Sequence, residues 1–304
     1  MRPVPRDLYP FEGRYETVNG HRMHLLDEGE GPPVVMVHGN PTWSFYYRNL
    51  VLALRDTHRC IVPDHIGCGM SDVPDDDTYD YHFQRRADDL EALLDQIGVE
   101  GPVTLVLHDW GGMIGMDWAD RHPDRVARLV LLNTAAFHLP STKPMPKRLS
   151  IVRDSSVGAF LVRGFNAFSG SATWMAMART KMPKRVRDAY TAPYDTWHNR
   201  IATLRFVQDI PLSEADRGFD RISAVSENLP QFDDRPVFIG WGLKDFVFDK
   251  HFLAVWEQKL PSAEVVRYED AGHYVLEDVG AELIERIVGF LGAHPVDGAA
   301  GAAE

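Results

Sequence analysis

The chain has 304 residues, 44% of them hydrophobic, and a formal net charge of -12. Its length suits one large domain or a core domain with an insertion, and its acidity argues against nucleic acid or an anionic membrane as a partner. Two cysteines are too few for a disulfide framework. No apolar run reaches the roughly 18 residues of a membrane span, and the start lacks the apolar core of a signal peptide. These features predict a cytoplasmic protein without a membrane span or a nucleic-acid partner.

The first part of the chain alternates predicted strands and helices. The turn signal Asn19-Gly20 joins two short strands, 14–18 and 22–27, which should open the sheet as an antiparallel hairpin. Apolar runs typical of buried parallel strands follow at 34–37, 59–63, 103–107 and 126–132. Helical patterns separate them at 44–54, 81–97 and 113–122. We therefore predict an α/β fold with a mostly parallel, eight-stranded sheet flanked by helices.

The alternation stops after residue 134 and resumes near residue 235. The segment between is helical in pattern and rich in large apolar side chains: Phe160, Phe165, Phe168, Trp174, Met175, Met177, Trp197 and Phe206. We expect residues 1–134 and 235–304 to form the core, with a loose tail from about 293, and residues 135–234 to form a helical cap. Most of the cap aromatics should pack between cap and core, and two or three should line a pocket.

Strand 103–107 runs into His108-Asp109-Trp110-Gly111-Gly112, which predicts a strand, a sharp turn and a helix. Glycines permit a strained turn that lifts one side chain above the carboxyl edge of a sheet. A carboxylate is already ionised at neutral pH, so it can attack an electrophilic carbon without a base. Asp109 is thus the candidate nucleophile of a covalent ester, although an aspartate before a helix is also a favoured N-cap.

Other candidate residues follow further predicted strands. Asp245 and His273 complete the chain order nucleophile, acid, histidine. The backbone N–H of Asn40, in the turn after strand 34–37, could join that of Trp110 in an oxyanion hole. Each of these residues follows a predicted strand at the position that a single active-site geometry requires. This agreement favours a catalytic site over coincidence. Neither histidine spacing nor a phosphate-binding glycine motif points to a ligand, so we expect no metal and no cofactor.

From about residue 9 to 291 the sequence resembles the α/β-hydrolase superfamily. Segments 38–44 (HGNPTWS), 108–112 (HDWGG) and 270–273 (DAGH) look like haloalkane dehalogenases. The resemblance implies that Asp109 displaces halide and that His273, oriented by Asp245, activates the water that hydrolyses the alkyl-enzyme ester. It also implies that the side-chain N–H groups of Asn40 and Trp110 stabilise the halide. The predicted function is therefore hydrolytic cleavage of carbon–halogen bonds to alcohol and halide.

Two departures bear on this interpretation. Leu107 stands where serine hydrolases usually have glycine, which disfavours an esterase. Asn133 and Thr134 occupy the place where some dehalogenases carry the acid, so Asp245 is the better choice for that role.

A second resemblance is as close. Segments 9–11, 19–23 and 58–69 are similar to the β-lactone decarboxylases of bacterial long-chain olefin biosynthesis, which open a cis-3,4-dialkyl β-lactone and release carbon dioxide and a cis-alkene. The catalytic residues do not separate the two activities, but the size of the cap pocket should. The expected partner is a small apolar substrate, either a haloalkane or a dialkyl β-lactone. A homo-oligomer and a complex with olefin-pathway enzymes are the alternatives for assembly.

Two less favoured functions complete the set. An epoxide hydrolase would also use an aspartate nucleophile, with Tyr190 and Tyr194 as acids that protonate the opening ring. A hydrolase-fold protein can also serve as a non-catalytic ligand-binding protein, although an intact triad argues against that.

Overall fold

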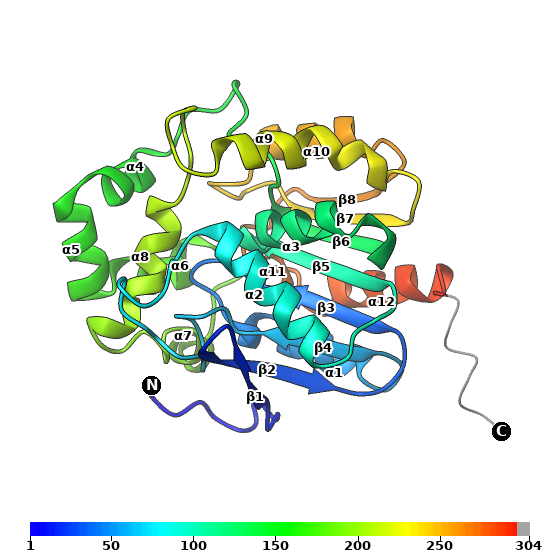
Figure 1. The fold of residues 1–304 in the computed structure, drawn as a ribbon, viewed down its shortest axis with the longest axis horizontal. Helices are drawn as coiled ribbons and strands as arrows, with labels where there is room; N and C mark the ends of the chain where they lie inside the picture. The colour runs from blue at the N-terminus through cyan, green and yellow to red at the C-terminus, as the bar shows by residue number, and fades with distance from the viewer. Residues whose placement is uncertain (297–304) are drawn as a thin grey trace.

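The computed structural model describes residues 1–296, and its eight strands form one sheet in the order β1-β2-β4-β3-β5-β6-β7-β8 (Figure 1). The pairs β1–β2 and β2–β4 are antiparallel, and the other neighbouring pairs are parallel. The strands are β1 (Arg14–Val18), β2 (His21–Glu28), β3 (Pro33–Val37), β4 (Arg59–Pro63), β5 (Val103–Asp109), β6 (Val126–Thr134), β7 (Val237–Gly242) and β8 (Glu264–Tyr268). The predicted mostly parallel sheet, opened by a hairpin, is confirmed.

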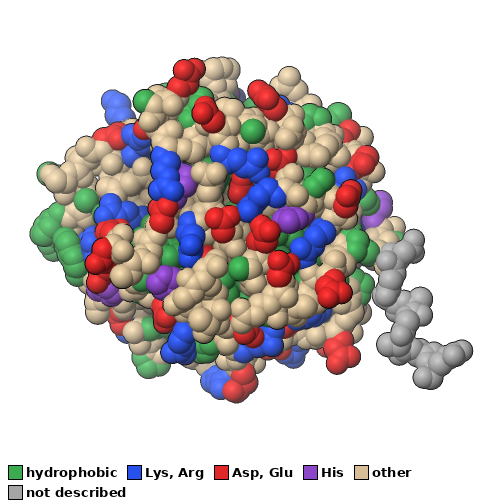
Figure 2. All heavy atoms as spheres, viewed as in Figure 1, with side chains coloured by type: hydrophobic (Ala, Val, Ile, Leu, Met, Phe, Trp, Pro, Cys, Tyr) green, Lys and Arg blue, Asp and Glu red, His purple; other side chains and the backbone are tan. Residues whose placement is uncertain are grey.

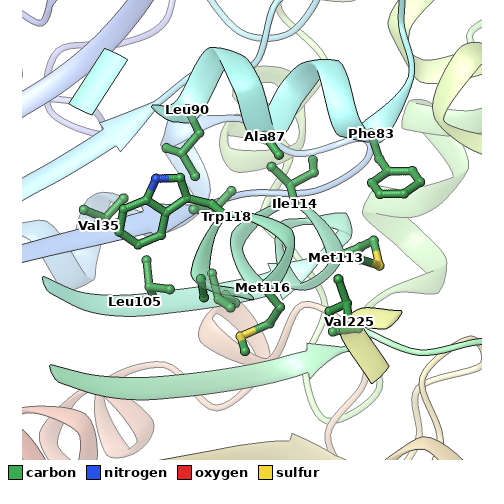
Figure 3. Packing of buried hydrophobic residues seen from close by; sticks show 14 of the residues in the cluster. Val35, Phe83, Ala87, Leu90, Leu105, Met113, Ile114, Met116, Trp118 and Val225 are labelled. Carbon is green, nitrogen blue, oxygen red and sulfur yellow. The ribbon is translucent and has the colours of Figure 1, made fainter. Parts of the chain in front are cut away.

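Side-chain alternation along the central strands divides the core between the two faces of the sheet. In β3, Val35 and Val37 belong to one buried cluster, while Val34 and Met36 belong to the other. Figure 3 shows the first cluster, in which α2 and α3 cover β3 and β5. The helices around the sheet are η1 (Ser44–Tyr47), α1 (Arg48–Leu54), α2 (Phe83–Gln96), α3 (Trp110–Arg121), η2 (Pro123–Arg125), α10 (Lys250–Lys259), α11 (Val275–Asp278) and α12 (Ala281–Ala293). Strands buried on both faces explain the nearly continuous apolar runs in the sequence.

The chain between β6 and β7 forms helices and no strand. They are α4 (Lys147–Asp154), α5 (Ser156–Phe165), α6 (Ala167–Met175), α7 (Lys184–Tyr190), η3 (His198–Arg200), α8 (Ile201–Gln208), α9 (Phe219–Asn228) and η4 (Leu229–Phe232). Helices α4, α5, α6 and α8 pack on one another, whereas α9 packs on α3 (Figure 1). The division at residues 134 and 234 stays a prediction. Most of the tail expected to be loose, 297–304, lies outside the described residues.

One expectation about the cap is wrong. Phe160, Phe165, Trp174 and Trp197 are exposed rather than packed between cap and core. The physical reason is that a composition rich in aromatic residues does not determine which side of a helix faces water. Among residues 1–296, no helix is both long enough and apolar enough to cross a membrane.

Candidate active site

Asp109 stands at the turn between β5 and α3 with φ +53° and ψ −128°, a conformation that L-residues rarely adopt. The chain can make this turn because the residues at positions 111 and 112 are glycines and have no side chain. A Cβ on Gly111 would lie 1.9 Å from the carbonyl oxygen of Val37, and one on Gly112 would lie 1.9 Å from Oγ1 of Thr134. The Thr134 hydroxyl donates a hydrogen bond of 2.5 Å to the carbonyl oxygen of Asp109. The strained backbone is thus held from both adjacent strands.

The carboxylate of Asp109 does not cap α3, because it accepts no hydrogen bond from that helix. It accepts instead from the backbone N–H of Asn40, at 2.5 Å from Oδ1. Only glycine fits beside it, since a Cβ on Gly39 would lie 2.1 Å from the same oxygen. The N-cap alternative for Asp109 is therefore wrong.

Leu107 is accommodated by a glycine on the next helix. A Cβ on Gly115 would lie 2.4 Å from Cδ2 of Leu107, so the leucine side chain fills the space that the glycine leaves. This contact explains how the turn tolerates a large residue two positions before Asp109.

The structure brings Asp109, Asp245 and His273 together at the carboxyl ends of β5, β7 and β8. Nδ1 of His273 donates to Oδ2 of Asp245 at 2.7 Å, and its Nε2 lies 3.5 Å from Oδ2 of Asp109. Burial alone would lower the pKa of His273, but the two carboxylates raise it to about 10. Burial alone would raise the pKa of Asp245, yet His273 lowers it below its ordinary value. The raised pKa of His273 and its contacts with both aspartates favour an imidazolium in the resting site.

Asn133, at the end of β6, supports the acid. Its Nδ2 donates to Oδ2 of Asp245 at 3.0 Å, and its Oδ1 accepts from the backbone N–H of Gly242 at 2.8 Å. The backbone N–H of Val247 donates to the other oxygen of Asp245 at 2.7 Å. From the sequence, Asn133 was notable only because it stands where some dehalogenases carry the acid. Its polar side chain at the end of a buried strand was the signal that could have revealed this role.

His108 contacts the backbone of His273. Its Nε2 donates to the carbonyl oxygen of His273 at 3.0 Å, and its ring stacks on Tyr46 at 4.2 Å between centroids. Burial, together with the nearby charge of His273, lowers the pKa of His108 to about 3. A neutral His108 can therefore hold the backbone of His273 without competing for its proton.

Asn40 and Trp110 both line the cavity that contains Asp109. The Asn40 side chain donates from Nδ2 to the carbonyl oxygen of Thr203 at 3.0 Å, which fixes the amide and leaves its second N–H available. The indole ring of Trp110 packs against Phe206 with 5.7 Å between centroids. The predicted donors thus lie beside the predicted nucleophile.

The cavity has a volume of about 790 Å³. Asn40, Asp109, Trp110 and His273 form a polar group on its wall, and much of the remaining lining is apolar, including Phe137, Leu149, Val162, Phe168, Met175 and Phe252. Of the eight large apolar cap residues named from the sequence, Phe168 and Met175 line this pocket, so one of those aromatics does so rather than the two or three expected. Within residues 1–296, no three His, Cys, Asp or Glu side chains are grouped to hold a metal ion.

The two tyrosines considered for an epoxide hydrolase do not line this cavity. The Tyr190 hydroxyl donates to Oε1 of Glu277 at 2.6 Å, and the Tyr194 hydroxyl donates to the carbonyl oxygen of Thr42 at 3.2 Å. Neither is placed to protonate an epoxide oxygen next to Asp109.

The fold and this arrangement define an α/β hydrolase. The family described as alpha/beta hydrolase fold matches residues 32–278, and the chain belongs to it. Over 284 residues it is 57% identical to a cis-3-alkyl-4-alkyloxetan-2-one decarboxylase of Shewanella oneidensis, covering 93% of this chain and 89% of the relative. Over 290 residues it is 31% identical to haloalkane dehalogenase 2 of Mycobacterium tuberculosis, covering 93% and 97%.

A solved structure agrees with the fold. The haloalkane dehalogenase DatA from Agrobacterium tumefaciens superimposes with a TM-score of 0.85 at 23% identity, covering 96% of this chain and all of that one (100%). Both resemblances seen in the sequence are confirmed as relationships, and the decarboxylase is much the more similar of the two reported relatives.

Proposed function

We propose that the protein is a β-lactone decarboxylase that converts cis-3,4-dialkyl oxetan-2-ones into cis-alkenes and carbon dioxide. The observation that carries the proposal is the cavity of about 790 Å³, whose largely apolar walls surround the carboxylate of Asp109. Such a volume lies in the upper part of the range for ligand pockets and has room for two alkyl chains. The 57% identity to a decarboxylase over nearly the whole chain supports the same substrate class.

The reaction needs only the carboxylate of Asp109 as a covalent catalyst. An oxygen of Asp109 attacks C4 of the lactone, the C4–O bond breaks, and the ring opens to an alkyl-enzyme ester with a free carboxylate on C3. The bond between C3 and that carboxylate then breaks, and its electron pair forms the C3–C4 double bond. The Asp109 oxygen leaves C4 with the ester electron pair, so carbon dioxide and the alkene are released without water or a proton.

The neighbouring groups stabilise the charges that move in these steps. The N–H groups of Asn40 and Trp110 are suited to the carboxylate released when the ring opens. His273 stays protonated and stabilises the carboxylate of Asp109 when it is expelled, while Asp245 and Asn133 hold the imidazolium in position. Residues 135–234 act as the cap that provides most of the apolar wall.

Dehalogenation is the second candidate, because the same donors suit a departing halide. Hydrolysis of the ester then requires His273 as a base. Esterification removes the charge of Asp109, which is one cause of the raised pKa of His273, and so favours the neutral imidazole that a base must be.

The test compares kcat/KM for a cis-3,4-dioctyl β-lactone, 1-bromobutane and 1-bromodecane, with the alkene measured by gas chromatography and bromide by ion chromatography. We expect the lactone to be the best substrate and bromoalkanes to react slowly, faster with longer chains. Each additional buried methylene contributes about 0.8 kcal/mol, which can raise kcat/KM by up to about fourfold. If 1-bromobutane reacts fastest and the lactone gives no alkene, dehalogenation is the native reaction.

A further inference from the structure

The outer surface of the cap exposes a cluster of large apolar side chains, here called the apolar cap face. In α5, Val157 and Phe165 are 64% and 70% exposed, and the spacing of Val157, Phe160, Leu161 and Phe165 places them on one side of the helix. Figure 1 shows α5 at the outer edge of the molecule, and Figure 2 shows hydrophobic side chains gathered at the same edge. Trp197, whose ring centre lies 6.0 Å from that of Phe160, belongs to the same face, and we include Ile151 of α4 and Trp174 of α6, which are exposed on helices that pack against α5.

The charge around this face differs from that of the whole chain. The segment 141–187, which contains α4, α5, α6 and part of α7, has ten Lys and Arg residues and a single acidic one, Asp154, although the chain carries -12 overall. The guanidinium of Arg187 lies 3.8 Å from the ring centre of Trp174, and that of Arg163 lies 4.9 Å from that of Trp197. Cations therefore border the exposed aromatic rings directly.

About half of this positive charge is neutralised nearby, because five of the ten cations pair with carboxylates: Lys143, Arg153, Arg179, Lys184 and Arg185. Within residues 1–296, Lys147, Arg148, Arg163 and Arg187 form no ion pair with a carboxylate. The acidic run 75–77 limits the face beyond Trp197, where Asp75 and Asp76 pair with His198 and Arg205. The whole-chain charge predicts repulsion from an anionic surface, but the unpaired cations beside this face favour local attraction.

The apolar cap face also borders the entrance of the cavity. Ile151, Leu161 and Arg148 line the cavity and are exposed to solvent as well. A molecule held against this face would therefore meet the opening that leads to Asp109.

We propose that the apolar cap face docks on the surface of an anionic lipid bilayer. Amphipathic helices bind at the bilayer interface through the same combination of exposed aromatic and aliphatic side chains with cations beside them. Phe160, Phe165 and Trp174 enter the interfacial layer, and Arg163 and Arg187 contact the anionic headgroups. The cavity then opens toward the phase in which long alkyl chains dissolve. Docking is a binding property of this surface and stands apart from the reaction proposed above.

The test is flotation of the full chain, without substrate, on vesicles of phosphatidylglycerol and phosphatidylcholine (1:1) or of phosphatidylcholine alone. We expect binding to the anionic vesicles to be at least tenfold stronger and to weaken in 0.5 M NaCl. Val157→Ser with Phe165→Ser, at positions outside the cavity lining, should weaken it at least tenfold. Leu52→Ser with Val288→Ser, which also removes two exposed apolar side chains, is the matched control and should change binding less than twofold.

A second pair of variants tests the charge. Arg163→Gln with Arg187→Gln should lower binding to anionic vesicles at least fivefold, whereas Arg14→Gln with Arg55→Gln removes the same charge elsewhere and should not. Unchanged melting temperatures establish that all four variants fold. Failure of the natural chain to float, or equal loss in test and control variants, overturns the proposal. A dimer in analytical ultracentrifugation that Val157→Ser with Phe165→Ser dissociates also overturns it, because the face is then an interface between two copies.

Discussion

Replacement of His273 by glutamine should separate the two reactions open to Asp109. Hydrolysis of an alkyl ester needs a base, and a positioned base contributes about 10²–10⁴ in rate, or about 3–5 kcal/mol. With a bromoalkane, His273→Gln should therefore release one equivalent of bromide and stop, with the ester retained on Asp109. Elimination from the lactone-derived ester needs no base, so alkene formation should continue.

The size of the remaining effect follows from the geometry. Nε2 of His273 lies 3.5 Å from Oδ2 of Asp109, and two unit charges at that distance interact by about 5 kcal/mol at an effective dielectric constant of about 20. If about half of that interaction energy stabilises Asp109 as it is expelled, the loss is about 2.5 kcal/mol, or about 70-fold in rate. The hydrogen bond from the backbone N–H of Asn40 to Asp109 is retained.

The assay is intact-protein mass spectrometry together with product counting. After 1-bromodecane, His273→Gln should carry one decyl adduct that the natural protein lacks. After the dioctyl lactone, the same variant should form more than one alkene per enzyme and show no lasting adduct. A persistent lactone adduct, or alkene limited to one equivalent, would show that His273 takes part in the elimination and would refute the mechanism.

Three further predictions concern neighbouring groups. Asp109→Asn should abolish alkene formation without changing the circular dichroism spectrum, because an amide is a poor nucleophile of nearly equal shape; activity that survives exclusion of deamidation by mass spectrometry contradicts this. Since folding raises the pKa of His273 from 6.5 to about 10, its stabilising effect is complete below about pH 6.5 and is lost as the pH rises toward 10. Urea unfolding should show up to about 5 kcal/mol less stability at the alkaline end, and His273→Gln should lack this dependence; equal slopes count against the raised pKa. Asn133→Asp places a second carboxylate against buried Asp245 and should cost about 3 kcal/mol of unfolding free energy, measured by the same titration, whereas unchanged stability means that the contact at 3.0 Å is unimportant.

The sheet could be predicted because its signals are local. The turn at Asn19-Gly20 uses positive φ at both residues, +48° and +92°, which this pair tolerates better than most. Buried strands require apolar side chains on both faces, and that requirement makes them visible as runs. The position of Asp109 followed from the same logic, since a strand that ends in a polar residue and two glycines predicts a sharp turn.

The cap was less predictable because several of its large apolar side chains are not buried. Phe165 and Trp174 are exposed, and no periodicity in the sequence distinguishes an apolar helix face that meets water from one that meets the core. The role of Asn133 depends on the neighbouring β7, whose loop carries Asp245. Contacts between segments more than a hundred residues apart leave no local pattern in the chain.

Leu107 and Gly115 occupy what is in effect a single volume shared between β5 and α3. Leu107→Gly alone would leave a void costing at least the 2–5 kcal/mol typical of a buried Leu→Ala substitution, and Gly115→Ala alone would overpack the same place by about 1–3 kcal/mol. Changed together, the two substitutions should compensate each other in part. The two sites therefore constitute a coupled pair, and redesign of this turn for a serine nucleophile must exchange both residues at once.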